Sequence, residues 1–399
     1  MSSQEITVAD LERDPHPVLA RLRAGAPAAW VPALGAWLVT GHAEALAVLR
    51  DARTFTVDDP RFSTARVVGP SMLSLDGAQH ARHRGPFTGP FRHDAVYAKL
   101  ADFTERETDR LVTAIEQSGV AELRRSVAGP LAVAVMAEAL GLTRTGPGTL
   151  LAWYDEIVAA TTAQAGSAAQ AGSAAQAAPA TAAFGELAAA LRQVIRGQAG
   201  LLSAAAGQLT EDETISNAAV LLFGGIETTE GMITNAMLHL LTSPAELARV
   251  SGSPELIPAA IEESLRLEPA AAVVDRYATS DITLGTARIS AGDQVTVSIT
   301  GANRDPAVFP DPDDYRVDRA NAGRHLAFAH GPHFCLGVHL ARLEARVAVT
   351  TMLARLPGLR LDHAAEDQAA ADRSPRGLVF RKPTSLVVRW ESGRGSVSA

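Results

Sequence analysis

The spacing of apolar and polar residues predicts a mostly helical chain. Residues 95–117 place apolar side chains at intervals of three and four, which is typical of a helix with one buried face. A second long helix is predicted over 213–241, where Thr210-Glu-Asp-Glu213 is an N-terminal signal and Ser243-Pro244 is a stop. Shorter helical patterns occupy residues 43–49, 76–84 and 336–353.

Short strand-like runs form a small β region. The pattern changes after Ala270, where brief apolar runs rich in β-branched residues replace the helical spacing. No obvious linker divides the chain, so we expect one domain over residues 1–399, with loose tails at 1–8 and 391–399. Strands are predicted at 36–40, 273–274, 282–284, 295–299 and 386–390.

A low-complexity segment interrupts this pattern. The six residues Ala-Gln-Ala-Gly-Ser-Ala at 163–168 are repeated at once at 169–174. Alanine favours helix, but the glycines interrupt it. We interpret the segment 161–180 as a surface loop that has tolerated a duplication.

Composition and charge narrow the class of protein. With 47% hydrophobic and 20% charged residues, the chain can bury a substantial core and is not a disordered protein. A formal net charge of -8 makes bulk nucleic-acid binding unexpected. The N-terminus has no signal pattern and no apolar run reaches bilayer length, so we expect a soluble, cytoplasmic protein without membrane contact.

Cys335 is the single cysteine of the chain. It therefore cannot form an intramolecular disulfide or a multi-thiolate cluster site. Three interpretations stay open on the residue alone: a small buried hydrophobe, a nucleophile with a histidine base, or one axial ligand to an iron. Its position before the helix at 336–353 favours a thiolate, because free N–H groups and the positive dipole end lie there.

The long helix at 213–241 contains two adjacent glycines, Gly224 and Gly225. Each costs about 1 kcal/mol in a helix relative to alanine, so either close approach of a ligand or packing of another helix must justify them. Gly224 and Thr228 are four residues apart and share a face. The Thr228 hydroxyl can therefore bond to the carbonyl of Gly224.

Two further pairs carry little signal alone. Glu263 and Arg266 have the spacing of an ordinary helical ion pair, which several other places in the chain also have. His80 and Arg84 are four residues apart on one predicted helix face, and an exposed polar face explains them equally well.

Together these segments resemble the cytochrome P450 family. The cysteine-ligand loop of that family, Phe-x-x-Gly-x-His-x-Cys-x-Gly, is matched at every defining position. Residues 224–229 are similar to its oxygen-binding helix, and 302–312 to the segment that precedes the cysteine loop. Gly224 replaces a commoner alanine, proline is missing near Gly77, and Ala329 stands where glycine is frequent, a position expected to tolerate alanine. The loop residues are Phe328, Gly331, His333, Cys335 and Gly337.

The resemblance implies a triangular, mostly helical prism with a small β region. Haem b is expected between the long helix and the loop, with Cys335 as the axial iron ligand. Glu227 and Thr228 are implied to relay protons to dioxygen, and the pair Glu263–Arg266 to be structural. The resemblance also implies that residues 161–180, between helices near 150–160 and 184–196, form a lid. Cofactor contacts are implied for His80, Arg84, Gly224, Arg276, Phe328, His333 and Gly337.

The activity that the resemblance implies is that of a haem-thiolate monooxygenase. Electrons are expected from a ferredoxin or flavodoxin-type donor, because the chain has no flavin motif and one cysteine cannot hold a cluster. Arg82, Arg342 and Arg346 can receive an acidic donor, although a solvated helix face explains them nearly as well. The expected reaction is hydroxylation or epoxidation of an apolar small molecule, in natural-product biosynthesis. Pocket residues are implied at Phe62, Val67, Val68, Met72, Leu222, Phe223, Val273, Val274 and Val379.

Three alternatives stay open within the same resemblance. Oxidative coupling or ring formation uses the same haem without inserting oxygen. A peroxide-driven peroxygenase is disfavoured, because it is expected to lack the Glu227–Thr228 pair. A non-catalytic haem-binding module is disfavoured for the same reason, since its relay residues need not persist.

Overall fold

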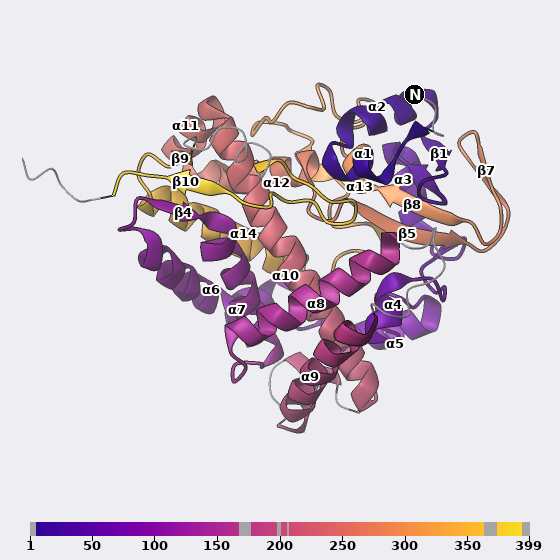
Figure 1. The fold of residues 1–399 in the computed structure, drawn as a ribbon, viewed down its shortest axis with the longest axis horizontal. Coiled ribbons are helices and arrows are strands. Elements are labelled where there is room, and N and C mark those ends of the chain that lie inside the picture. The colour runs from indigo at the N-terminus through magenta and orange to yellow at the C-terminus, as the bar shows by residue number, and fades with distance from the viewer. Residues whose placement is uncertain (1–4, 167–176, 198–200, 206, 363–372, 393–399) are drawn as a thin grey trace, which may run out of the picture.

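The computed structural model describes residues 5–166, 177–197, 201–205, 207–362 and 373–392, and the predicted helical character is confirmed. Figure 1 shows the long helix α10 crossing the middle of the molecule, with the largest sheet to one side of it. The helices are α1 Val8–Arg13, α2 His16–Gly25, α3 His42–Arg50, α4 Ser63–Val68, α5 Gly77–Thr88, α6 His93–Ile115, α7 Gly129–Leu140, α8 Pro147–Gly166, α9 Ala177–Arg196, α10 Glu211–Thr242, α11 Pro244–Gly252, α12 Ile257–Leu267, α13 Ile299–Ala302 and α14 Val338–Arg355.

The strands of the described residues form three small sheets. The largest has the order β1-β2-β8-β5-β3, in which β2 and β8 are parallel and the other neighbours antiparallel. The others have the orders β4-β10-β9 and β6-β7. The strands are β1 Ala28–Val31, β2 Ala36–Val39, β3 Phe55–Thr56, β4 Val120–Glu122, β5 Val273–Ala278, β6 Ile282–Leu284, β7 Ala287–Ile289, β8 Gln294–Ser298, β9 Arg360–Leu361 and β10 Val387–Arg389.

The start of α10 is fixed by the predicted capping signal. The Thr210 hydroxyl accepts a hydrogen bond from the backbone N–H of Glu213 at 3.2 Å, and the Glu213 carboxylate accepts one from the backbone N–H of Thr210 at 2.9 Å. These two bonds satisfy donors that a helix N-terminus otherwise leaves free. Most of the helix beyond this point is buried, so α10 is the central element of the core.

The two glycines of α10 have different neighbours. A Cβ on Gly225 would collide with the side chain of Met136 on α7, whereas a Cβ on Gly224 would meet nothing within 4 Å outside its own helix. Gly225 therefore lets α7 and α10 pack closely, and Gly224 faces open space. Helix packing therefore explains Gly225, and the open space beside Gly224 leaves room for a ligand.

The N-terminal tail differs from the expectation. Residues 1–4 lie outside the described part, but Ile6 is 5% exposed and packs with Leu11 and Leu19. Thr7 caps α1 through a capping box with Asp10. Residues 5–8 are thus tied to the fold, because burial of Ile6 and two capping hydrogen bonds outweigh the freedom of a chain end.

The other expected irregular segments lie partly outside the described residues. In the predicted lid at 161–180, α8 extends to Gly166 and α9 begins at Ala177, and residues 167–176 between them are outside. In the predicted tail at 391–399, Glu391 donates its backbone N–H to the carbonyl of Pro357 at 2.8 Å, and residues 393–399 are outside. No helix in the described part is long and apolar enough to cross a bilayer.

Candidate active site

Cys335 lies in a tight loop just before α14. Its backbone N–H donates to the carbonyl of Phe328 at 2.9 Å, which closes the loop. Gly331 has a φ of +72°, and a Cβ there would collide with the carbonyl oxygen of Leu49 at the end of α3. Glycine is therefore needed at 331 for both conformation and space.

The loop also contains a strained alanine. Ala329 has a φ of +56°, which is in the left-handed region that L-residues disfavour. The sequence departure at this position was expected to be tolerated, and the structure accommodates it at a conformational cost of about 1 kcal/mol or more.

Burial and the neighbouring polar groups have opposite effects on the pKa of the Cys335 thiol. Burial raises its pKa and is the largest influence. A hydrogen bond from the backbone of Gly337 and the positive charges of Arg84 and Arg342 act in the opposite direction, but the pKa stays above the ordinary value for a cysteine. The helix N-terminus alone therefore does not make this thiol a thiolate. A metal ion that binds the sulfur would do so.

Basic side chains gather near this loop. The rings of His80 on α5 and His333 have centroids 4.4 Å apart, and Arg84 donates to the carbonyl of Phe334 at 2.6 Å. Burial, followed by the charges of His333 and Arg84, lowers the pKa of His80 to about 4. His80 is thus neutral near pH 7. Arg276 on β5 completes the group, and Arg84, Arg276 and His333 all line one cavity together with Cys335.

These basic groups fit the carboxylates of a haem. Among the described residues, the buried Nε2 of His80 has no hydrogen-bond partner, and the buried Arg276 guanidinium bonds only to the carbonyl of Asp275, at 2.7 Å. Burial lowers the pKa of Arg276 to about 10, which still leaves it charged near pH 7. A buried cation without a carboxylate partner is costly, so this edge of the cavity is suited to an anionic ligand.

Asp76 organises the same edge. Its carboxylate pairs with His333 Nε2 at 2.8 Å and accepts hydrogen bonds from the Thr56 hydroxyl at 2.7 Å and the backbone N–H of Val57 at 2.8 Å. Burial acts to raise the pKa of Asp76, but these bonds outweigh it and lower the pKa to about 2. Asp76 thereby fixes the ring of His333. The sequence pattern did not single it out.

The α10 wall of the cavity contains Gly224, Gly225, Thr228 and Thr229. The Thr228 hydroxyl donates to the carbonyl of Gly224 at 2.6 Å, which confirms the predicted back-bond. Glu227 is not among the lining residues. Its carboxylate lies 2.8 Å from the ammonium of Lys382, and its side chain is 5% exposed. The structure therefore places Thr228 at the cavity and its neighbour Glu227 in a buried ion pair.

The implied pocket residues separate into two groups. Phe62, Met72, Phe223, Val273, Val274 and Val379 line the cavity. Val67, Val68 and Leu222 do not, because α4 and α10 turn them into the apolar core. The sequence pattern missed several other lining residues, and only the fold brings these distant segments together. They include Ser63, Thr64, Leu73, Phe91, Met136, Leu221, Met232 and Phe380.

Glu344 is the most unexpected lining residue. It lies on α14, is 1% exposed, and its Oε2 has no hydrogen-bond partner among the described residues. Burial raises the pKa of Glu344 well above the ordinary value for a glutamate. Nine positions after a cysteine on an amphipathic helix, it looks like any solvent-facing glutamate in the sequence, so no signal there could have identified it.

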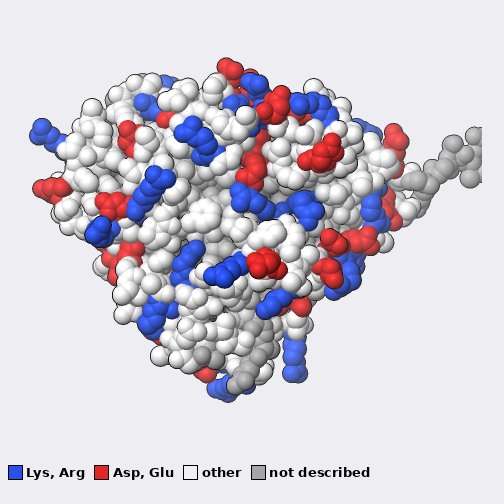
Figure 2. All heavy atoms as spheres, turned by 180° about the vertical axis from the view of Figure 1, so that it is seen from behind, with Lys and Arg blue, Asp and Glu red and all other residues white. Residues whose placement is uncertain are grey.

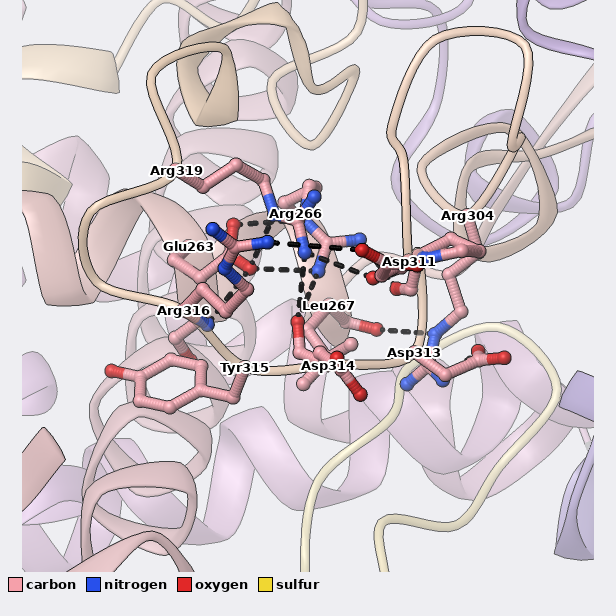
Figure 3. Close-up of polar contacts among 12 residues, drawn as sticks. Glu263, Arg266, Leu267, Arg304, Asp311, Asp313, Asp314, Tyr315, Arg316 and Arg319 are labelled. Carbon is pink, nitrogen blue, oxygen red and sulfur yellow. Dashed lines mark hydrogen bonds and ion pairs between the residues drawn. The ribbon is translucent and has the colours of Figure 1, made fainter. Parts of the chain in front are cut away.

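The predicted pair of Glu263 and Arg266 is fully buried, and Figure 3 shows how it lies. Arg266 donates to both Glu263 carboxylate oxygens at 2.8 Å. Arg319 donates to Oε1 of the same carboxylate at 2.8 Å. Arg266 also reaches the carbonyls of Asn303, Pro312 and Asp314 at 2.7–3.1 Å. This network joins α12 to the irregular segment that leads to the cysteine loop.

A cysteine and a helix threonine that line one largely apolar cavity, with unpaired basic side chains at its edge, define the site of a haem-thiolate protein. Comparison with known proteins agrees. Residues 254–384 match the family model described as Cytochrome P450. The chain is 34% identical to "Cytochrome P450 monooxygenase PikC" of Streptomyces venezuelae, over 96% of this chain and 93% of that protein. The chain belongs to the cytochrome P450 family, and it is a haem-thiolate monooxygenase.

Other relatives support the same assignment. The chain is 33% identical to "Mycinamicin IV hydroxylase/epoxidase" of Micromonospora griseorubida, over 89% of each protein. Its fold matches the crystal structure of CalO2 with a TM-score of 0.87 at 29% identity, over 96% of this chain and 98% of that one. It also matches CxnD, described as a cytochrome P450 enzyme for C–S bond formation in chuangxinmycin biosynthesis, with a TM-score of 0.84 at 28% identity, over 97% of each chain.

The role of Asp76 can be tested by its pH dependence. Because the folded-state pKa is lowered from 3.8 to about 2, the stabilisation from this carboxylate is present above pH 3.8 and is lost as the pH falls through about 2. We expect Asp76→Ala to lower the free energy of unfolding by roughly 2 kcal/mol near neutral pH, since three hydrogen bonds to a charged group are removed. The difference from the parent should shrink below pH 3.8. Denaturant unfolding at several pH values measures it, with the exposed Asp58→Ala as control. A difference that did not depend on pH in this range would contradict the assignment.

The strain at Ala329 makes a second prediction. Ala329→Gly should raise the free energy of unfolding by about 1 kcal/mol, because glycine adopts a positive φ without the steric penalty. Ala327→Gly, in the same loop but with an ordinary φ, should instead destabilise the protein slightly through the added freedom of the unfolded chain. Denaturant unfolding of the two variants compares them directly. Equal destabilisation by both would show that the loop is not strained at 329.

Proposed function

We propose that this protein inserts oxygen from dioxygen into a largely apolar small molecule, by hydroxylation or epoxidation, in the biosynthesis of a natural product. The observation that carries the proposal is the shared cavity of Cys335 and Thr228, whose remaining wall is mostly apolar. The relatives support the substrate class, because one of them is described as a hydroxylase/epoxidase of mycinamicin IV.

The chain's own residues suit the haem that the family binds. Cys335 is the residue that would bind the haem iron, since it is the single cysteine and lies in the loop that the family uses. His80, Arg84, Arg276 and His333 are the proposed partners of the haem carboxylates. Bound there, haem supplies the activation of dioxygen, and the cysteine thiolate increases electron density at the iron.

Thr228 and Glu227 are the proposed proton relay. The Thr228 hydroxyl lines the cavity and can accept a proton from one side while it donates one to the other. Its bond to the Gly224 carbonyl fixes the oxygen atom in the wall of α10. The Glu227 carboxylate is adjacent in the chain, and a carboxyl group exchanges protons readily. The apolar lining of the cavity around Thr228 keeps bulk water away from the reacting atoms.

An external ferredoxin or flavodoxin-type protein is the proposed electron donor. Phe334 immediately precedes Cys335 and is 40% exposed, so a donor that contacts it would come within one residue of the ligand. Figure 2 shows Lys and Arg side chains around a largely uncharged area near the middle of one face. Arg82 and Arg342, named from the sequence, already pair with Glu213 at 2.9 Å and Glu262 at 2.6 Å. They are therefore weaker candidates for a donor site than the pattern indicated.

Oxidative bond formation without oxygen insertion is the second candidate. It is favoured by one observation: CxnD, which is described as an enzyme for C–S bond formation, shares the fold at 28% identity. Both reactions need the same haem, so they differ in the fate of the oxygen atoms.

Isotopically labelled dioxygen distinguishes the two candidates. Purified protein is first screened for small molecules that shift its Soret band, and the binders are then turned over with a ferredoxin and its reductase. Label in the product supports the proposal, whereas a coupled product without label supports the second candidate. A reduced carbon monoxide complex without the red-shifted Soret band of thiolate ligation would overturn the role of Cys335.

Removal of the Thr228 hydroxyl tests the relay. We expect Thr228→Ala to lower product formed per electron by at least about tenfold, because a positioned proton donor contributes on the order of a hundredfold or more. The lost electrons should be recovered as hydrogen peroxide, which is measured together with the product.

Thr234→Ala is the matched control for Thr228→Ala. Thr234 lies on the same helix and makes the same kind of back-bond, to the Glu230 carbonyl at 2.6 Å, but it does not line the cavity. Its substitution should leave product formed per electron unchanged. If both variants behaved alike, the effect would belong to the helix and the relay would be wrong.

A further inference from the structure

A buried lysine holds the carboxylate of Glu227. The ammonium of Lys382 lies 2.8 Å from Glu227 Oε1, contacts the carboxylate of Glu230, and donates to the Tyr154 hydroxyl at 3.4 Å. The Lys382 side chain is 11% exposed. The chain contains one other lysine, Lys99, and uses arginine for its remaining basic residues. One of the two lysines of the chain therefore lies in a cluster of charged side chains beside α10.

The cluster around Lys382 is balanced in charge. Glu230 also accepts from Arg124 Nε at 3.0 Å, so two carboxylates face two cations. Arg124 contacts Glu230 and the carbonyl of Thr384, at 3.0 Å each, and among the described residues it makes no hydrogen bond or ion pair to Glu227. Among the described residues, Lys382 is thus the ion-pair partner of Glu227, while Glu230 has two. Removal of Lys382 would leave a buried carboxylate without a partner, which is costly.

Lys382 belongs to a segment that is itself fixed to the cavity. Phe380, two residues earlier, lines the cavity and packs its ring edge-on against Phe223 with centroids 5.6 Å apart. Arg381 donates its backbone N–H to the Ala270 carbonyl at 2.9 Å and pairs with Glu268 at 2.8 Å. These contacts fix the backbone of Lys382, so its ammonium is held at a defined place beside α10.

Glycine in α10 makes the approach of this segment possible. A Cβ on Gly231 would lie 2.8 Å from the Cβ of Ala270 and 3.6 Å from the Cβ of Lys382. Any larger residue at 231 would push the segment away from the helix. Gly231 is one turn after Glu227, so the same small residue brings the lysine to the acid.

We propose that Lys382 is a positioning residue for proton delivery, and this inference rests on the relay proposed above. Glu227 is the outer end of the relay and takes up a proton from water. It passes the proton to the Thr228 hydroxyl, which releases its own proton into the cavity. Lys382 keeps its proton throughout and holds the Glu227 carboxylate in the orientation that allows proton transfer to Thr228. Without this anchor, Glu227 would turn toward other partners and proton supply would slow.

The test measures electron consumption with dioxygen as the acceptor, in light and heavy water, with plant-type ferredoxin and its reductase as the donor system. No substrate is needed, because proton delivery accompanies oxygen reduction in its absence. Lys382→Met keeps the apolar stem and removes the charge. We expect it to slow electron consumption by roughly tenfold and to raise the solvent isotope effect, since a misplaced proton donor becomes rate-limiting.

Two variants separate positioning from stability. Lys382→Arg keeps a cation that can bridge two carboxylates and should restore most of the rate. Arg124→Gln removes the other cation of the cluster without touching Glu227. It should lower the melting temperature but leave the rate and the isotope effect as in the parent. Should Arg124→Gln reproduce the kinetic loss of Lys382→Met, the role of Lys382 would be structural and the inference would be overturned.

A charge-balanced variant covers the case in which Lys382→Met does not fold. Lys382→Met combined with Glu230→Gln leaves Arg124 and Glu227 as one cation and one carboxylate. It removes the anchor of Glu227 while the cluster stays neutral. The same slower rate and larger isotope effect are expected, and a parental rate would contradict the inference.

Glu227→Gln distinguishes failure of this inference from failure of the relay. If Glu227→Gln leaves the rate and isotope effect unchanged, the proposed relay is wrong and the inference falls with it. If Glu227→Gln slows electron consumption but Lys382→Met does not, only the role of Lys382 is wrong. If the relay and the role of Lys382 are both correct, the two residues act in one path. Lys382→Met should then cause no further loss of rate in a protein that already carries Glu227→Gln.

Discussion

A fully buried carboxylate fixes the path of the chain toward the cysteine loop. Glu263 on α12 receives hydrogen bonds from Arg266 and Arg319, which come from segments more than fifty residues apart. Buried charges are tolerated only when they are paired and fully hydrogen-bonded, so this carboxylate permits one arrangement of its neighbours. The remaining guanidinium donors then bind carbonyls of the irregular segment at 303–314. That segment has little regular structure and depends on these bonds for its shape.

The edge of the cavity near the cysteine loop departs from this rule, because some buried basic groups there have no partner within the chain. Most buried charges in the described residues have partners, as Glu268 does with Arg381 at 2.8 Å. Among the described residues, Arg276 lines the cavity and bonds only to the carbonyl of Asp275, and the buried, neutral His80 has an Nε2 without a partner beside the ring of His333. Buried basic groups without a partner are costly, and an anionic ligand in the cavity would lower that cost. A buried charge that is paired within the chain stabilises the fold. A buried basic group without a partner in the chain is suited to bind a cofactor.

Sequence patterns located the elements better than they located the lining of the cavity. The capping signal at Thr210 and the stop at Ser243 bounded α10 to within two residues, because caps act locally. The glycine pair was ambiguous, and only packing against Met136 separated the role of Gly225 from that of Gly224. The family resemblance implied that Val67 and Val68 line the pocket, but the structure turns them into the core. The rotation of a short helix decides which side chains face inward, and no local pattern specifies it.

The sequence by itself determined the family, the cysteine loop and the order of the helices, because these depend on neighbouring residues and on one unpaired thiol. The tertiary structure decided which distant groups meet. It joined Lys382 to Glu227 across more than a hundred and fifty residues, set Asp76 against His333, and placed Glu344 in the cavity wall. Such contacts arise from close packing of remote segments, and each residue alone looks like an ordinary charged surface position. The sequence gives the charge of each residue, and burial in the fold decides whether that charge must be paired.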